Sequence, residues 1–182
     1  MTQRLDYFAA APQGYKALGG VKSYLQGCGL AAQLVDLVYL RVSQINGCAY
    51  CINQHSRDLL SLGVSADKVQ LVPVWREAES LFDARERAAL AWAETVTLVH
   101  QTAIPDADYQ AVAAVFGEKE LADLTLAIGL MNALNRVGVG FRLGDWMTNS
   151  PSSSRCSAKA SRVIACWRCA STGRSSGWPA FG

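Results

Sequence analysis

The stretch that decides the fold is "LVDLVYLRVSQINGCAYCINQHSRDLLSLG", residues 34–63. Its apolar residues recur near helical spacing on both sides of Asn46-Gly47, a pair that commonly interrupts a helix. We therefore predict a helix over residues 30–45, a turn, and a second helix from Cys48 to Leu62 that stops at Gly63. The second helix carries two cysteines and a histidine close to its start.

The rest of the chain favours helices as well, because it is rich in Ala and Leu and has only five prolines in 182 residues. A capped short helix is expected after Ser65, and Asp83 with Glu86 has the form of a capping box. The predicted further helices cover residues 84–100, 105–116 and 121–141. We predict an all-α domain over residues 1–148.

Charge and hydropathy exclude several classes of partner. Residues 1–148 hold all 15 acidic residues and 12 of the 17 basic ones, a net charge of −3. Nucleic-acid binders concentrate positive charge, so we expect no nucleic-acid partner. The N-terminal residues lack the basic start and apolar run of a secretory signal, and the apolar segment "LADLTLAIGLMNAL" contains Asp123, Thr125 and Asn132. We expect no membrane span and a cytoplasmic protein.

The last segment, residues 149–182, has a different character. It reads "NSPSSSRCSAKASRVIACWRCASTGRSSGWPAFG", with five basic residues, no acidic ones and no long helical pattern. We predict an irregular C-terminal tail, either a disordered extension or the product of a shifted reading frame.

The chemistry is expected at Cys48, Cys51 and His55, which follow the spacing C-x-x-C-x-x-x-H. On a helix, offsets of three and seven residues place all three side chains within about 60° of arc. The first turn of a helix has unpaired backbone N–H groups and the positive end of the dipole, which favour a thiolate over a thiol. The histidine, one turn after Cys51, can exchange a proton with that thiol.

Two thiols suit peroxide chemistry for a specific reason. A thiolate that attacks an O–O bond becomes a sulfenic acid, and a second thiol can convert it to a disulfide before irreversible oxidation. An external dithiol can then reduce the disulfide by exchange. In a reducing compartment, a C-x-x-C pair is more typical of catalysis or metal binding than of a structural disulfide.

Two other interpretations of the motif remain open. A zinc site would need further ligands from Cys28, His100 or the "CWRC" of residues 166–169, and the last pair lies in the atypical tail. Two buried cysteines could also simply pack in a core. We favour the redox interpretation, and expect neither a metal nor a cofactor.

Residues 34–72 resemble the alkylhydroperoxidase D-like branch of the carboxymuconolactone decarboxylase family. The resemblance rests on R-x-S-Q-I-N-G-C-x-Y-C-x-x-x-H, which is far longer than a bare C-x-x-C. The later segments "FDARERAALAWAETVTLV" and "LTLAIGLMNALNRVGVGFR" are similar to the family's following helices, so the resemblance covers residues 10–145. It implies an all-helical fold, homo-oligomers that are commonly trimers or hexamers, and a peroxidase site on the motif helix.

The resemblance also implies roles for individual residues. Cys51 would attack the peroxide, Cys48 would resolve the sulfenic acid, and His55 would belong to a proton relay. The family's relay uses a glutamate twelve residues before the first cysteine, where this chain has Asp36. The aspartate is shorter by about 1.5 Å, one C–C bond, so we allow for a bridging water to His55. Only the break at Asn46-Gly47 can bring it to the site, because a continuous helix would leave it about 120° from Cys48.

The predicted function is a thiol-dependent peroxidase with an antioxidant role. Its substrate would be hydrogen peroxide or an organic hydroperoxide, and its reductant a lipoyl or a thioredoxin- or glutaredoxin-like dithiol. Lactone decarboxylation and a non-enzymatic redox sensor are the alternatives, and the paired cysteines favour the peroxidase over the decarboxylase. On the last helix we interpret Asn135 and Arg136 as structural, with Arg136 paired to a carboxylate.

Overall fold

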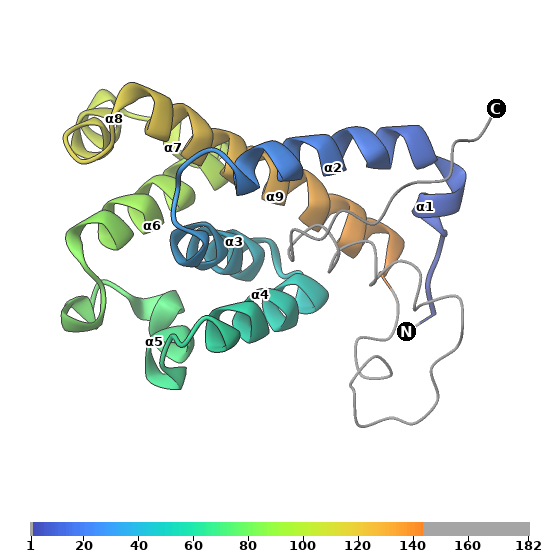
Figure 1. The fold of residues 1–182 in the computed structure, drawn as a ribbon, viewed down its shortest axis with the longest axis horizontal. Helices are drawn as coiled ribbons and strands as arrows, with labels where there is room; N and C mark the ends of the chain where they lie inside the picture. The colour runs from blue at the N-terminus through green and yellow to red at the C-terminus, as the bar shows by residue number, and fades with distance from the viewer. Residues whose placement is uncertain (1, 144–182) are drawn as a thin grey trace. The chain divides into compact units, whose positions relative to one another are not determined.

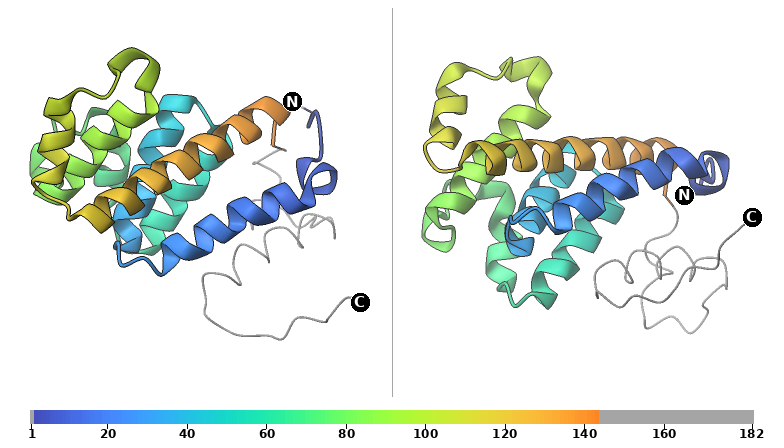
Figure 2. Two further views of the ribbon diagram at one scale, coloured as in Figure 1. Left: turned by 90° about the horizontal axis from the view of Figure 1, so that it is seen from above. Right: turned by 45° about the horizontal axis from the view of Figure 1, so that its top comes forward.

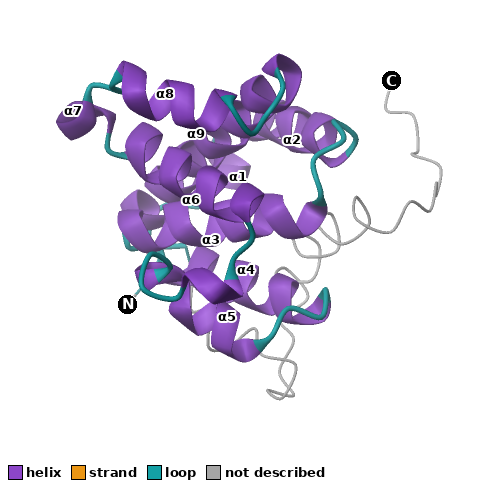
Figure 3. Ribbon diagram, turned by 90° about the vertical axis from the view of Figure 1, so that its left-hand side faces the viewer, coloured by secondary structure: helices purple, strands orange, loops and turns teal. Residues whose placement is uncertain are grey.

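A computed structural model describes residues 2–143, and every regular element among them is a helix (Figure 3). The elements in chain order are α1 (Tyr7–Ala10), α2 (Pro12–Gln26), α3 (Ala32–Asn46), α4 (Ala49–Ser61), α5 (Ala66–Leu71), η1 (Val72–Val74), η2 (Glu79–Leu81), α6 (Ala84–Thr97), α7 (Val99–Thr102), α8 (Asp106–Ala113) and α9 (Glu118–Phe141). The all-α prediction is confirmed for these residues. The atypical tail of residues 149–182 lies outside the described part of the chain.

Helix α3 lies at the centre of the domain and makes extensive contacts with α4, α6 and α9 (Figure 1). Its apolar residues occupy two sides. Leu37 and Leu40 are fully buried in one hydrophobic cluster, while Val38 and Val42 are fully buried in another. Burying each such side chain contributes about 1.5–3 kcal/mol. The two-sided burial explains why this segment determines the fold.

The two clusters divide the core between different helices. The first joins α3 to α6 and α9, and it includes both Cys48 and Cys51. The second joins α3 to α4 and to the segment that follows α4, and it is centred on Leu59, Trp75 and Phe82. The cysteines therefore lie where the start of α4 meets the larger cluster.

The predicted interruption between α3 and α4 is confirmed. Gly47 has φ 67°, the left-handed conformation that glycine adopts without strain and that commonly ends a helix. The backbone N–H of Cys48 then donates to the Ser43 carbonyl at 3.0 Å, which closes the end of α3. The chain turns sharply, and α4 begins with Cys48 as its N-cap. At its other end, Gly63 has φ 85° directly after Leu62.

The predicted caps on the next two helices are also confirmed. The Ser65 hydroxyl accepts from the Lys68 backbone N–H at 3.2 Å at the start of α5. At the start of α6, Asp83 and Glu86 form a reciprocal capping box, with hydrogen bonds of 2.8 and 2.9 Å. The Lys68 ammonium contacts both Glu86 carboxylate oxygens at 2.6 Å, so one carboxylate caps α6 and ties α5 to it.

A second carboxylate joins α3 to α6. Glu94 accepts from Arg41 at 2.7 Å and from the Trp75 indole at 3.0 Å, and it also pairs with Arg76. Burial raises the pKa of Glu94, but the hydrogen bonds from Arg76, Trp75 and Arg41 outweigh burial and hold it below its ordinary value. The carboxylate therefore stays ionised and holds Arg41 of α3 against α6.

The structure departs from the predicted helices at several points, and the helix predicted over residues 105–116 is α8, which ends at Ala113. The segment predicted as one helix over residues 84–100 is divided at Leu98 into α6 and α7. Leu98 has φ −96° and ψ 30°, outside the helical range, and the Thr102 hydroxyl donates to the Thr95 carbonyl at 2.8 Å, so the chain bends between the two helices. Helix α2 was not predicted, because it contains Gly14, Gly19 and Gly20, which disfavour a helix, and only Leu25 of its fifteen residues is buried. It runs beside α9 (Figure 2).

Helix α9 is, among the described residues, the one helix that is long and apolar enough to cross a membrane by length and composition. Its buried residues include Leu124, Ala127 and Ile128, and all three belong to the larger hydrophobic cluster. We interpret α9 as the core helix that the sequence predicted, starting three residues earlier than expected.

Candidate functional site

Cys48 and Cys51 lie at the start of α4, and their sulfur atoms are bonded as a disulfide with a Cα–Cα distance of 5.4 Å. Cys48 is the N-cap residue and Cys51 is in the first turn. They are 2% and 7% exposed. The predicted spacing thus brings the two sulfurs into bonding contact on one turn of helix.

Helix α9 passes very close to the disulfide. A Cβ atom placed on Gly138 would lie only 3.3 Å from the Cys48 sulfur, closer than most real Cβ contacts. This glycine therefore lets α9 approach the dithiol directly. The close approach also explains the burial of Cys48.

His55 lies one turn after Cys51 and is 4% exposed. Its Nδ1 atom is 3.0 Å from an Asp36 carboxylate oxygen, so the break between α3 and α4 does bring Asp36 to the histidine. The contact is direct, and the bridging water allowed for the shorter aspartate is not needed. The Tyr39 ring packs against the imidazole, with 5.0 Å between ring centroids. An Nδ1–H that donates to Asp36 leaves Nε2 free to act as a base.

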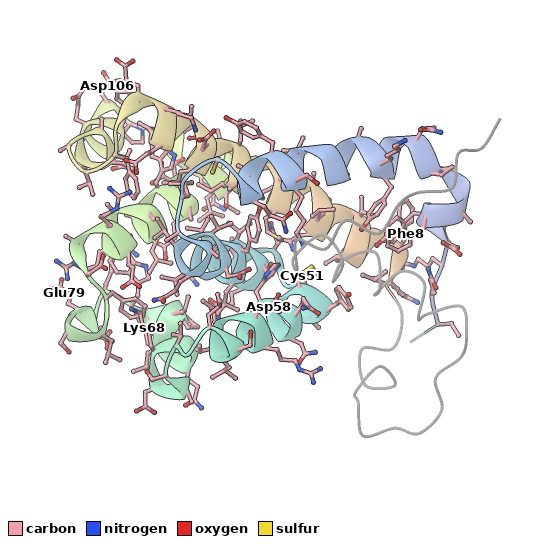
Figure 4. All side chains as sticks on the ribbon, in the orientation of Figure 1. Phe8, Cys51, Asp58, Lys68, Glu79 and Asp106 are labelled. Atoms are coloured by element: carbon pink, nitrogen blue, oxygen red, sulfur yellow. A yellow bond between two sulfur atoms is a disulfide. The ribbon has the colours of Figure 1, made fainter. Side chains whose placement is uncertain are left out.

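Asp58 is a second carboxylate at the same histidine, and sequence reasoning missed it. Its Oδ2 atom is 3.9 Å from His55 Nδ1, beyond hydrogen-bond range. The Gln54 amide nitrogen donates to both Asp58 oxygens at 2.9 and 3.0 Å. The i,i+3 spacing of His55 and Asp58 was the signal that could have revealed the pair. Figure 4 shows Cys51 and Asp58 at different points along α4.

The charges of these carboxylates act on two further titratable groups. Burial lowers the pKa of Lys22 on α2, while Asp36 and Asp58 act in the opposite direction and raise it. Burial raises the pKa of Tyr50, and the charge of Asp58 adds to this effect. A lysine from a helix that the sequence did not predict therefore belongs to the electrostatic surroundings of the histidine.

A partly buried polar network holds the turn before the dithiol against α9. The Asn46 amide donates to the side-chain oxygens of Asn132 and Asn135 at 3.0 Å, and Asn135 donates to the Ser43 hydroxyl at 3.1 Å. The structural role predicted for Asn135 agrees with these contacts. Within residues 2–143 the structure shows no carboxylate partner for Arg136. This arginine donates to the carbonyl and side-chain oxygens of Asn132, because Asn132 lies one turn before it on α9.

The family-model comparison matches residues 10–95 to the carboxymuconolactone decarboxylase family. The uncharacterized protein YdfG of Bacillus subtilis is 32% identical over 139 residues, which cover 76% of this chain and 94% of the relative. The chain belongs to the carboxymuconolactone decarboxylase family. The matched residues of the family model include all of α3, α4 and the site between them.

Solved structures place this family member in the alkylhydroperoxidase D-like branch. A protein of unknown function from Agrobacterium tumefaciens, described as a candidate antioxidant defence protein AhpD, is 36% identical with a TM-score of 0.75. The superposition covers 79% of this chain and 97% of that one. An uncharacterized peroxidase-related protein from Ralstonia eutropha, an alkylhydroperoxidase AhpD core, has a TM-score of 0.64 at 22% identity. This superposition covers 78% of this chain and 76% of the Ralstonia eutropha chain, and it shows that the two share a fold.

A zinc site built on the two cysteines of the motif finds no support among the described residues of this family member. The one group of three closely spaced potential ligands in that part of the chain is Asp36, His55 and Asp58, which contains neither Cys28 nor His100. Both sulfurs of the motif are engaged with each other. The "CWRC" pair of residues 166–169 lies outside the described residues.

An apolar hollow of about 760 Å³ lies away from the cysteines. Helices α2 and α9 supply most of its lining, including Leu18, Val21 and Leu126, and Trp92 and Tyr109 complete it. Neither cysteine and neither member of the His55–Asp36 pair lines it. The hollow is therefore separate from the dithiol.

Proposed function

We propose that this protein is a thiol-dependent peroxidase that reduces hydrogen peroxide or organic hydroperoxides through Cys51 and Cys48. The observation that carries the proposal is that the start of α4 holds two sulfurs in bonding contact, with a buried histidine paired to a partly buried aspartate one turn further on. Membership of the family's AhpD-like branch supports it.

The first step uses the reduced dithiol. His55 takes the proton of the Cys51 thiol, and the thiolate attacks one peroxide oxygen. The O–O bond breaks, Cys51 becomes a sulfenic acid, and the leaving alkoxide takes the proton from the imidazole and departs as an alcohol, or as water from hydrogen peroxide. Asp36 at Nδ1 orients the ring and balances its charge while it holds the proton.

The second step closes the disulfide. The Cys48 thiol attacks the Cys51 sulfur, an S–S bond forms, and the sulfenic oxygen leaves as water with the proton of Cys48. The start of α4 already holds the two residues at a Cα–Cα distance that a disulfide requires. An external dithiol, lipoyl or thioredoxin- or glutaredoxin-like, then restores both thiols and is itself oxidised.

The decisive test is peroxide consumption by the full-length chain with a dithiol reductant. We expect Cys51→Ser to abolish turnover, because no thiolate remains to attack the O–O bond. Cys28→Ser is the matched control, since Cys28 is the free cysteine of the described residues and takes no part in the disulfide. Equal rates for wild type and Cys51→Ser would end the proposal.

Two alternatives predict different outcomes in the same assay. A non-enzymatic redox sensor would form the disulfide only slowly with peroxide, yet bind a partner in one redox state. A decarboxylase would act on a lactone substrate, and Cys51→Ser would leave that activity intact.

We also propose a cytoplasmic homo-oligomer, a trimer or hexamer, on the basis of the family resemblance. Light scattering of the purified chain measures the subunit number.

A further inference from the structure

Two carboxylates from different helices converge on one nitrogen of a buried histidine. Asp36 Oδ1 from α3 and Asp58 Oδ2 from α4 lie 3.0 and 3.9 Å from His55 Nδ1. One donor atom from each residue lies within 4.8 Å of the other two. In the part of the chain that the structure describes, this is the one such group of three.

We propose that Asp36, His55 and Asp58 form a binding site for a divalent transition-metal cation of the Zn²⁺ type. Zinc binds imidazole nitrogen and carboxylate oxygen at about 2.0–2.2 Å, so its ligand atoms lie roughly 3.0–3.5 Å from one another. Of the two measured separations from His55 Nδ1, 3.0 Å lies at the lower end of that range and 3.9 Å lies above it. Two carboxylates and a neutral imidazole also supply the negative charge that neutralises a dication.

The histidine distinguishes this group from an ordinary cluster of surface acids. The His55 side chain is 5% exposed, while those of Asp36 and Asp58 are 20% and 41% exposed. The buried ring supplies a fixed ligand atom, and the half-exposed Asp58 gives an ion access from solvent. Gln54 holds both Asp58 oxygens, as the outer partners of metal ligands commonly do.

Lys22 opposes a cation at this position. Burial lowers the pKa of Lys22, whereas the charges of Asp36 and Asp58 raise it, so the positive charge of its ammonium acts at the same two carboxylates. A cation that enters must therefore overcome the repulsion of this lysine. Removing its charge is expected to tighten binding, an effect opposite in sign to the loss of a ligand.

Binding would compete directly with the proton relay. The Nδ1 atom that would bind the cation is the atom that contacts Asp36. Cation occupancy and the relay therefore exclude each other, and peroxide reduction would slow when the site is filled. This consequence for rate rests on the proposed function, whereas the binding itself does not.

The test is calorimetric titration of Zn²⁺ into the full-length, tag-free chain without peroxide. The Cys48–Cys51 disulfide is kept intact and all other thiols are alkylated, so that no thiolate can bind the ion. We expect one Zn²⁺ at this site, and at least about ten-fold weaker binding for Asp58→Asn. Lys22→Gln should bind more tightly than wild type. Asp106→Asn, an exposed aspartate on α8, is the matched control and should bind unchanged.

Absence of Zn²⁺ binding, or equal affinities for wild type and Asp58→Asn, would overturn the proposal. Circular dichroism of each variant separates loss of a ligand from loss of fold. Tighter binding by Lys22→Gln cannot come from unfolding, so weaker or unchanged binding by this variant, if folded, would also count against the site. Because the oxidised chain performs no turnover, these results are independent of whether the protein is a peroxidase.

Discussion

The starts of α4 and α6 show two uses of the same structural element. At α6, Asp83 caps the helix, Glu86 returns the hydrogen bond, and the box is complete. At α4, the N-cap residue is Cys48, which makes no side-chain cap hydrogen bond, and the first turn contains no acidic residue. The same unpaired N–H groups and dipole are present in both helices.

The difference shows where the chain places chemistry and where it places stability. A carboxylate cap satisfies the backbone N–H groups and stabilises a helix, but it also occupies the position at which an anion would be favoured. The start of α4 lacks such a cap, so its backbone groups can stabilise a thiolate at Cys51 in the reduced protein. The comparison predicts that substitutions at α4 change activity and that substitutions at α6 change stability.

The largest expected effect comes from Cys48→Ser. We expect one turnover followed by loss of activity, because the Cys51 sulfenic acid has no thiol to resolve it and is oxidised further by excess peroxide. Mass spectrometry of the variant after one equivalent and after excess peroxide measures the oxygen atoms added to Cys51. Sustained turnover by Cys48→Ser at the rate of the Cys28→Ser control would show that the pair at α4 does not act as a unit.

A smaller effect is expected from Asp36→Asn. An asparagine keeps the shape but removes the charge facing His55 Nδ1, and we expect the peroxide rate to fall by about 10²-fold, within the range for acid–base catalysis. Asp36→Glu restores a carboxylate and should recover part of the rate. The rate is measured against pH for all three proteins. A purely structural role for Asp36 would predict an unchanged pH profile and equal losses for both variants.

The helices around the site could be predicted because their signals are local. Asn46-Gly47, Ser65 and the Asp83 capping box each set a boundary through neighbours in the chain, and the structure confirms all three. Helix α2 was not predicted because Gly14, Gly19 and Gly20 disfavour a helix there and its single buried residue is Leu25. Its packing along α9 is a tertiary contact, which a short stretch of the sequence cannot indicate.

The residues of the site can likewise be divided into those that local spacing predicted and those that it did not. The contact between Cys48 and Cys51 follows from their spacing at the start of α4, and His55 lies one turn further along the same helix, as the spacing predicted. Predicting the position of Asp36 required both the family resemblance and the break at Gly47. Its role in catalysis stays a prediction. Lys22 comes from the unpredicted α2, and the sequence offered no signal for it.

The smallest expected effect tests the other half of the comparison. Asp83→Ala removes the cap at the Glu86 backbone N–H, a hydrogen bond of 2.8 Å, and should lower the free energy of unfolding by about 1 kcal/mol. For a chain of this size, that corresponds to a fall of about 2–4 °C in Tm, measured by thermal denaturation. Asp83→Asn is the matched control, because asparagine caps about as well as aspartate. Both variants should reduce peroxide at the wild-type rate, since neither touches α4. A loss of rate in folded Asp83→Ala would mean that the two helix starts are coupled, and the division between stability at α6 and chemistry at α4 would fail.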